Sequence, residues 1–312
     1  MLEIKGDSDH TKLIDMLTDL NDYSIGIEDV LKEHFDEENI VYWMAFQILM
    51  GNVDTQNRNV YLYSPLNSDI WYFIAWDNDG CLMRSEYELK NFSDQGSWEK
   101  GISNYWGNVL FQRCLKSRSF REKLNDAILE LREYLNKDML ISKIESYKNV
   151  LKPYLYSMPD AEYEPLTSEQ YDQIVASLPD EIEKNYKLYL ESLETPMPFY
   201  IGVPTIDGNK LKFNWDVSYD LDAEDITYSV EVARDYLFQD VIYHNTTLTV
   251  PETEMDLPEA GQYFVRIRAT NTSGKTQDAF DYYVTDEGKH YGMKCFYITE
   301  DSTVEEDNYE EG

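Results

Sequence analysis

The sequence predicts a multidomain α+β protein, in which a mostly helical N-terminal part with one short β-hairpin precedes an all-β sandwich. Apolar residues recur at helical spacing within residues 13–50 and 105–194, and they alternate along short runs beyond residue 198. The chain has 312 residues, and at about 150 residues per domain this length suggests two domains. Hydrophobic residues make up 42% of the chain, which is ample for packed cores.

Three helices are expected before residue 51. The first follows Asp9, and the second covers residues 27–35. The third begins after Asp36, a favoured N-cap residue, and stops at Gly51, a favoured C-terminal residue. This third helix is apolar nearly all round except for Gln47, so we expect it at the centre of its domain. Two apolar strands then form a short hairpin, at residues 59–63 and 70–76.

Residues 105–194 predict helices throughout. One of these helices is expected to end near Pro153, because proline removes a backbone donor. Thr167 and Gln170 have the spacing of a capping box at the start of the next helix. Pro179 suits the first turn of the last helix.

A Thr-Pro-Met-Pro segment at residues 195–198 marks a boundary, because alternating apolar strands separated by turn residues begin there. The last residues, 300–312, carry seven acidic side chains and no basic one, which predicts a disordered tail. We therefore expect a helical domain, a β-sandwich and a tail, at residues 1–195, 198–298 and 299–312.

The chain is strongly acidic, with 60 acidic against 27 basic residues and a formal charge of -33. This charge repels phosphate backbones and anionic lipid and attracts cations, so a nucleic acid is not an expected partner. No apolar stretch reaches the roughly 18–20 residues of a membrane span. The start of the chain lacks the features of a signal peptide and resembles a strand from a longer protein. Three scattered cysteines leave the compartment open.

The candidate chemistry lies in two acidic turns. Asp54 precedes Asn59 by five residues, between the apolar helix and the first strand, and the second strand ends at Trp76-Asp77-Asn78-Asp79-Gly80. Phosphoryl transfer uses a loop aspartate as base, an asparagine downstream for magnesium, and an aspartate after another strand as metal ligand. Asp54, Asn59 and Asp77 suit these roles in that order, and Asp79 competes with Asp77 for the third.

The spacing alone also fits a structural interpretation. Asp54 and its neighbours can serve as turn formers that bind nearby backbone amides. The Asp77–Gly80 turn can likewise be an ordinary hairpin turn or a calcium loop. A second acidic run, Asp220-x-Asp222-x-Glu224, lacks the glycine of a calcium loop and is interpreted as a solvated strand connection.

Residues 38–80 resemble the C-terminal lobe of the CotH protein kinase family, the spore-coat kinases and their relatives. The resemblance rests on Gly-Asn-x-Asp-x4-Asn-x-Tyr-Leu-Tyr at residues 51–63 and on Trp-Asp-x-Asp-Gly at residues 76–80. It implies an atypical kinase that transfers phosphate from ATP, with Mg or Mn, to serine or threonine of a protein substrate. It further implies that Asp54 is the catalytic aspartate, Asp77 the metal-binding one and Asn59 the catalytic-loop asparagine.

The chain departs from a kinase before residue 51, where it has no Gly-x-Gly-x-x-Gly and where Lys5 stands too near the terminus for the phosphate role. We therefore expect a portion of a longer kinase, inactive alone, whose partner is the missing N-terminal lobe of the same protein. The alternative is a non-catalytic pseudokinase or scaffold that uses its β-sandwich to dock a partner at the cell surface.

Residues 198–288 resemble fibronectin type III modules. Trp215 suits the buried tryptophan of an early strand, and Tyr263 suits the tyrosine corner. Such modules act as spacers or binding surfaces. Both resemblances together imply a secreted, cell-surface or spore-associated bacterial protein, while a cytoplasmic location stays open.

Overall fold

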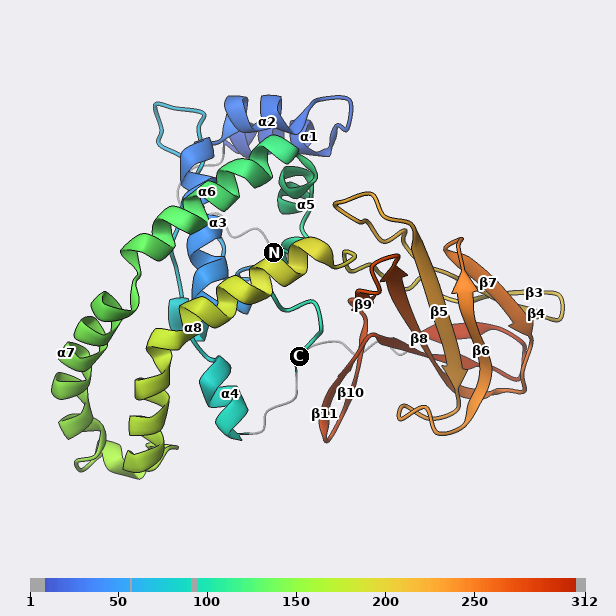
Figure 1. Cartoon of the computed structure of the whole chain (residues 1–312). Coiled ribbons are helices and arrows are strands. Elements are labelled where there is room, and N and C mark those ends of the chain that lie inside the picture. The colour runs from blue at the N-terminus through green and yellow to red at the C-terminus, as the bar shows by residue number, and fades with distance from the viewer. Residues whose placement is uncertain (1–8, 57, 91–94, 307–312) are drawn as a thin grey trace. The chain divides into compact units, whose positions relative to one another are not determined.

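The computed structural model describes residues 9–56, 58–90 and 95–306 and has a mixed α+β fold (Figure 1). It divides into two compact units. We call residues 1–91 with 105–189 the helical unit, and residues 92–104 with 190–312 the β unit. No described helix is both long and apolar enough to cross a membrane.

Eight helices are found in the described part of the chain, together with a two-stranded antiparallel sheet of β1 (Tyr61–Tyr63) and β2 (Tyr72–Ile74). The helices are α1 (Thr11–Asn21), α2 (Ile27–His34), α3 (Glu37–Met50), α4 (Arg84–Lys90), α5 (Val109–Lys116), α6 (Arg118–Tyr134), α7 (Lys137–Leu155) and α8 (Ser168–Glu194). The expected hairpin is confirmed, although each strand is shorter than the sequence suggests.

Helix α3 is the centre of the helical unit, as its apolar surface predicts. The Asp36 carboxylate caps it by accepting a hydrogen bond from the Asn39 amide at 2.9 Å. Its Trp43 ring lies 5.7 Å from Phe111 and 4.8 Å from Phe73, measured between ring centroids. Burial of most of its side chains gives this helix a fixed position and therefore a fixed C-terminal end.

The helix that was expected to end near Pro153 does so, since α7 ends at Leu155. The prediction that a helix starts at Pro179 is wrong, because Pro179 lies inside α8, which bends along its length in Figure 1 but continues. Buried side chains follow Pro179 on the same helix, including Glu181 at 0% and Asn185 at 2% exposure. Their contacts outweigh the one backbone hydrogen bond that proline removes. The capping box of α8 is confirmed, since the Gln170 amide donates to Thr167 Oγ1 at 3.2 Å and Gln170 Oε1 accepts from the Thr167 amide at 2.9 Å.

The β unit contains two larger antiparallel sheets. A three-stranded sheet has the order β3-β4-β7, and a six-stranded sheet has the order β13-β12-β8-β5-β6 with β9 beside β8. The strands of the first are β3 (Thr205–Asp207), β4 (Lys210–Asn214) and β7 (Glu252–Asp256). Those of the second are β5 (Ile226–Ala233), β6 (Val241–Leu248), β8 (Gly261–Asn271), β9 (Thr276–Asp278), β12 (Met293–Ile298) and β13 (Val304–Glu306).

One hydrophobic core joins these two sheets. Inward residues of β4 and inward residues of β5, β8 and β12 belong to the same buried cluster, with Trp215 5% exposed among them. Strands β10 (Tyr282–Thr285) and β11 (Gly288–Tyr291) form a separate hairpin. The alternating apolar residues of the sequence agree with the buried positions of β5 and β8.

The C-terminal segment differs from the expected disordered tail. Residues 304–306 form β13, which pairs with β12. A turn in which the Thr299 amide donates to the Thr303 carbonyl at 2.9 Å brings Val304 against the core. This segment gains backbone hydrogen bonds from β12, and its Glu306 pairs with Lys294 of that strand at 3.1 Å. Residues 307–312 lie outside the described residues.

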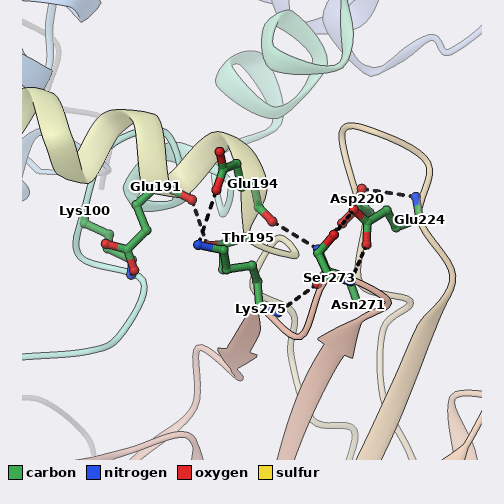
Figure 2. Close-up of polar contacts among 9 residues, drawn as sticks. All are labelled: Lys100, Glu191, Glu194, Thr195, Asp220, Glu224, Asn271, Ser273 and Lys275. Atoms are coloured by element: carbon green, nitrogen blue, oxygen red, sulfur yellow. Dashed lines mark hydrogen bonds and ion pairs between the residues drawn. The ribbon is translucent and has the colours of Figure 1, made fainter.

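A buried polar cluster at Asn271 fastens the last turn of α8 within the β unit (Figure 2). The Asn271 side-chain amide donates to the Glu194 carbonyl at 3.0 Å and to the Asp220 carboxylate at 2.9 Å, and its oxygen accepts from the Lys275 amide at 2.9 Å. The loop before α5 joins the same unit, since Lys100 pairs with Glu191 at 2.9 Å. We refer to Asn271 and its partners as the Asn271 cluster.

Candidate functional site

The first acidic loop leaves helix α3 at Gly51, a backbone position that favours glycine. Gly51 has φ of +65°, and a β-carbon there would stand 2.6 Å from the side-chain nitrogen of Asn185. That amide cannot move away easily, because it donates to the Leu49 carbonyl at 3.0 Å and accepts from Arg84 Nε at 2.5 Å. Helix α8 thus holds the point at which the loop leaves α3.

The loop itself is a single 3-10 turn, Val53–Gln56, built on two buried polar residues. Asn52 is 2% exposed and accepts a hydrogen bond from the Asp54 amide at 3.3 Å. Thr55 is fully buried and donates to the Asn52 carbonyl at 3.0 Å, with the Tyr105 hydroxyl also 3.0 Å away. Because its neighbours point inward, Asp54 is left exposed at the surface of the turn.

The second acidic loop adjoins the first. Asp77 follows β2 with φ of +49° and precedes a 3-10 turn, Asn78–Gly80. A β-carbon on Gly80 would stand 3.2 Å from a carboxylate oxygen of Asp54, so the two loops touch. The charge of Asp79, more than burial or the charge of Asp54, raises the pKa of Asp77. Asp54, Asp77 and Asp79 therefore repel one another at one exposed place. We call the two turns that carry them the acidic loops.

Asn59 is the predicted site residue that the structure joins least clearly to the others. It is half-buried with φ of +53°, two residues before β1. Among the described residues, no hydrogen bond links its side chain to Asp54, Asp77 or Asp79. A ligand that bridges these groups is needed for Asn59 to act with them.

The acidic loops hold no ready-made metal cage: in the described ranges, no three His, Cys, Asp or Glu side chains are grouped to hold an ion. Their chemistry nevertheless fits magnesium or manganese. Magnesium prefers oxygen ligands and usually takes only one or two carboxylates, completing its shell with water and substrate phosphates. Carboxylates that repel one another at an exposed place, as Asp77 and Asp79 do, gain from such a cation.

Sequence reasoning missed three amides beneath the acidic loops. Gln47 of α3 and Asn52 both donate to the side-chain oxygen of Asn78, at 3.1 Å and 3.3 Å. Gln47 as the polar residue in an otherwise apolar helix was the available signal. Burial raises the pKa of the nearby Cys81 thiol to about 12, which disfavours the thiolate form that a nucleophilic cysteine uses.

The hairpin between the two loops presents an exposed aromatic face. Tyr61, Tyr63 and Trp76 are each about half exposed, and the rings of Tyr61 and Trp76 lie 4.9 Å apart. Tyr61 is two residues from Asn59, and Trp76 directly precedes Asp77. The apolar face and the acidic loops thus lie at adjoining parts of the chain.

Comparisons with known proteins point to one family. Residues 2–189 match the family model described as CotH kinase protein. No curated protein matches the chain significantly.

Two solved structures show weak similarity. The twitchin kinase region from C. elegans (Fn31-NL-kin-CRD-Ig26) is 16% identical with a TM-score of 0.23, over 30% of this chain and 20% of that one. Domains 1–6 of the surface layer protein SbsC are 12% identical with a TM-score of 0.17, over 98% of this chain and 40% of that one. The family match covers more than half of the sequence, including both acidic loops, and the chain therefore belongs to the CotH kinase protein family.

Proposed function

We propose that this chain is a portion of a CotH-type protein kinase that transfers phosphate from ATP to serine or threonine of a protein substrate. The observation that carries the proposal is the meeting of Asp54, Asp77 and Asp79 at one exposed place. Two segments that are separate in the sequence, each matching the family's motif, supply these residues. Phosphoryl transfer asks a protein mainly for such positioning and for a charge-neutralising metal.

Asp54 is the proposed general base. It is exposed, and its turn is fixed from within by Asn52 and Thr55, so its carboxylate can accept the proton of an incoming hydroxyl group. Asp77, Asp79 and Asn59 would hold Mg or Mn with the phosphates of ATP. When bound, the metal neutralises charge on the transferring phosphoryl group. The charge of Asp79 raises the pKa of Asp77, which supports this pair of carboxylates as the place where a cation is bound.

Residues 1–195 are proposed to be the C-terminal lobe of this kinase. The nucleotide clamp is assigned to a further lobe of the same protein, because no Gly-x-Gly-x-x-Gly stands in the printed sequence. On this proposal, the chain alone transfers phosphate poorly and needs that lobe as its partner.

Residues 198–298 are proposed to be a fibronectin type III-like module. Its three-stranded sheet and the β12-β8-β5-β6 part of the larger sheet surround one core. The Tyr263 hydroxyl donates to the Glu259 carbonyl at 2.8 Å, which is the contact of a tyrosine corner. Such a module supports a role as spacer or docking surface, and we propose a secreted, cell-surface or spore-associated location.

The second candidate is a non-catalytic scaffold in which both units only bind partners. The exposed aromatic face of the hairpin, with Tyr61, Tyr63 and Trp76, favours it as a contact surface. The two candidates differ in what the acidic loops do, since a scaffold has no use for Asp54 as a base.

Phosphate transfer from radiolabelled ATP to a generic protein acceptor tests the proposal, with the chain expressed together with its upstream lobe. We expect Asp54→Asn to lower transfer about 100-fold or more, because it removes the base. Asp69→Asn, in the exposed turn of the same hairpin, is the matched control and should transfer normally. Equal transfer by Asp54→Asn and wild type would remove Asp54 from the chemistry. No transfer by the wild type would favour the scaffold.

A further inference from the structure

Three neutral amide side chains lie under the acidic loops and connect them. Gln47 is fully buried in α3, Asn52 is 2% exposed at the start of the first loop, and Asn78 stands between Asp77 and Asp79. They come from three places in the sequence, up to 31 residues apart. Their meeting is therefore a product of the tertiary fold and not of a local turn.

The contacts among these amides all converge on one atom. The oxygen of Asn78 accepts from Gln47 Nε2 at 3.1 Å and from Asn52 Nδ2 at 3.3 Å. The other end of Asn52 accepts the backbone amide of Asp54 at 3.3 Å. One continuous path thus runs from α3 through Asn78 to the backbone of the proposed base.

Gln47 is poorly explained as a residue that serves stability. Its side-chain oxygen is buried and has no hydrogen-bond partner among the described residues, and such an atom disfavours the folded state. A leucine would fill the same place in this apolar helix without that loss. The one contact that an apolar side chain cannot replace is the donation to Asn78. Local rules of packing are broken in this way mainly at functional sites.

Contacts between the acidic loops would offset the repulsion of their carboxylates. We call Gln47, Asn52 and Asn78, which supply such contacts, the brace. Asp54, Asp77 and Asp79 carry like charges on two separate turns, so repulsion drives the turns apart when no cation is bound. A charged donor would form ion pairs with these carboxylates and compete with the metal. Neutral amides hold the turns through Asn78 and leave the carboxylate oxygens to other ligands.

We propose that Gln47 and Asn52 are positioning residues, which hold Asn78 and so keep Asp77 and Asp79 placed to share one cation beside Asp54, the proposed base. The inference rests on the proposed function, since it assigns these carboxylates to a metal. Outer residues that orient metal ligands typically change metal affinity by about 10–100-fold when replaced.

Terbium binding tests the brace without relying on catalysis. Trp76, directly before Asp77 and half exposed, can sensitise Tb3+ emission, and the signal lost in Asp77→Asn defines the site. We expect Gln47→Leu to weaken Tb3+ binding at this site about tenfold while thermal stability is equal or higher. Tyr42→Phe, elsewhere on α3, is the matched control and should bind as the wild type does. A stable Gln47→Leu chain with unchanged Tb3+ affinity overturns the proposal.

A second variant protects the test against a folding failure. Asn78→Ala changes a half-buried loop residue and should weaken Tb3+ binding to the same degree, because the brace loses its central acceptor. Normal Tb3+ binding by Asn78→Ala overturns the brace. The protein could bind Tb3+ in a way that depends on Asp77 and Gln47 and yet transfer no phosphate, even with its upstream lobe. That result would support the brace and reject the kinase activity. Wild-type protein without any Asp77-dependent emission rejects the metal site and the brace together.

Discussion

The Asn271 cluster and the acidic loops use the same kinds of residue to opposite effect. In the β unit, the Asn271 side chain makes three hydrogen bonds, and one of its partners, Asp220, also accepts the amides of Asp222 and Glu224. In the helical unit, Gln47 is buried with an unpaired oxygen, and Asp77 is repelled by Asp79. A buried cluster whose polar atoms are all paired stabilises its fold. A cluster with an unpaired polar atom and repelling charges is less stable alone and can be stabilised by a ligand.

The largest expected effect is on the Asn271 cluster. Asn271→Leu should lower the free energy of unfolding of the β unit by about 3 kcal/mol, because one carboxylate oxygen of Asp220 and the Glu194 carbonyl lose the donor that Asn271 supplies. Urea unfolding followed by tryptophan fluorescence measures it. Asn245→Leu on the edge strand β6 is the control, with a change of about 0.5 kcal/mol or less. Equal values for the two variants would show that the Asn271 cluster does not hold the unit together.

A smaller effect tests how firmly the first acidic loop is anchored. Gly51→Ala should cost about 2 kcal/mol, from a left-handed backbone and from the collision with Asn185. Gly208→Ala is the matched control, because Gly208 has φ of +62° but open space around its α-carbon, and it should cost about 1 kcal/mol. The difference between the two free energies reports the contact with Asn185. No difference would mean that Asn185 gives way and does not fix the loop.

The smallest effect is the opposite response of the two regions to acid. Hydrogen bonds from Ser273 and then Thr272 hold the pKa of Glu224 below its usual range. The contribution of Glu224 to stability is therefore present above pH of about 4.3 and is lost as the pH falls through the lowered value. The pKa of Asp77 is raised, so its contribution is present below pH of about 3.9 and is lost as the pH rises through the raised value.

Thermal unfolding between pH 3 and pH 7 separates the two responses. Relative to the wild type, Glu224→Gln should be less stable at pH 7 and equal at low pH. Asp77→Asn should be more stable at pH 7 and equal at low pH. The same pH dependence in both variants would contradict the contrast between the two regions.

Local signals in the sequence predicted the parts of the site that local structure controls. Asp36 and Gly51 mark the two ends of α3 because capping depends on residues next to the helix end. The two apolar runs between the acidic turns likewise predicted the hairpin of β1 and β2. These elements carry Asp54 and Asp77, so the backbone of the candidate site was readable from the sequence.

Contacts between distant residues decided what the sequence could not predict. Pro179 stays inside α8 because buried neighbours such as Glu181 hold that helix, the Glu181 carboxylate accepting the Ser85 amide at 2.6 Å. Strand β13 forms because β12 offers it backbone partners, in spite of its acidic side chains. The meeting of Gln47 with Asn78 depends on the whole fold of the helical unit, and no local pattern reports it.

The central claim is that repulsion within the acidic loops lowers the stability of the protein and that binding of a metal with a nucleotide relieves it. Thermal unfolding of the wild type and of Asp77→Asn, each expressed together with the proposed upstream lobe and measured with and without manganese and ATP, tests it most directly. We predict that Asp77→Asn melts at a higher temperature than the wild type without ligands, because a repelled charge is gone. Only the wild type should then gain stability from manganese and ATP. An Asp77→Asn chain that melts lower and still gains from both ligands would contradict the claim.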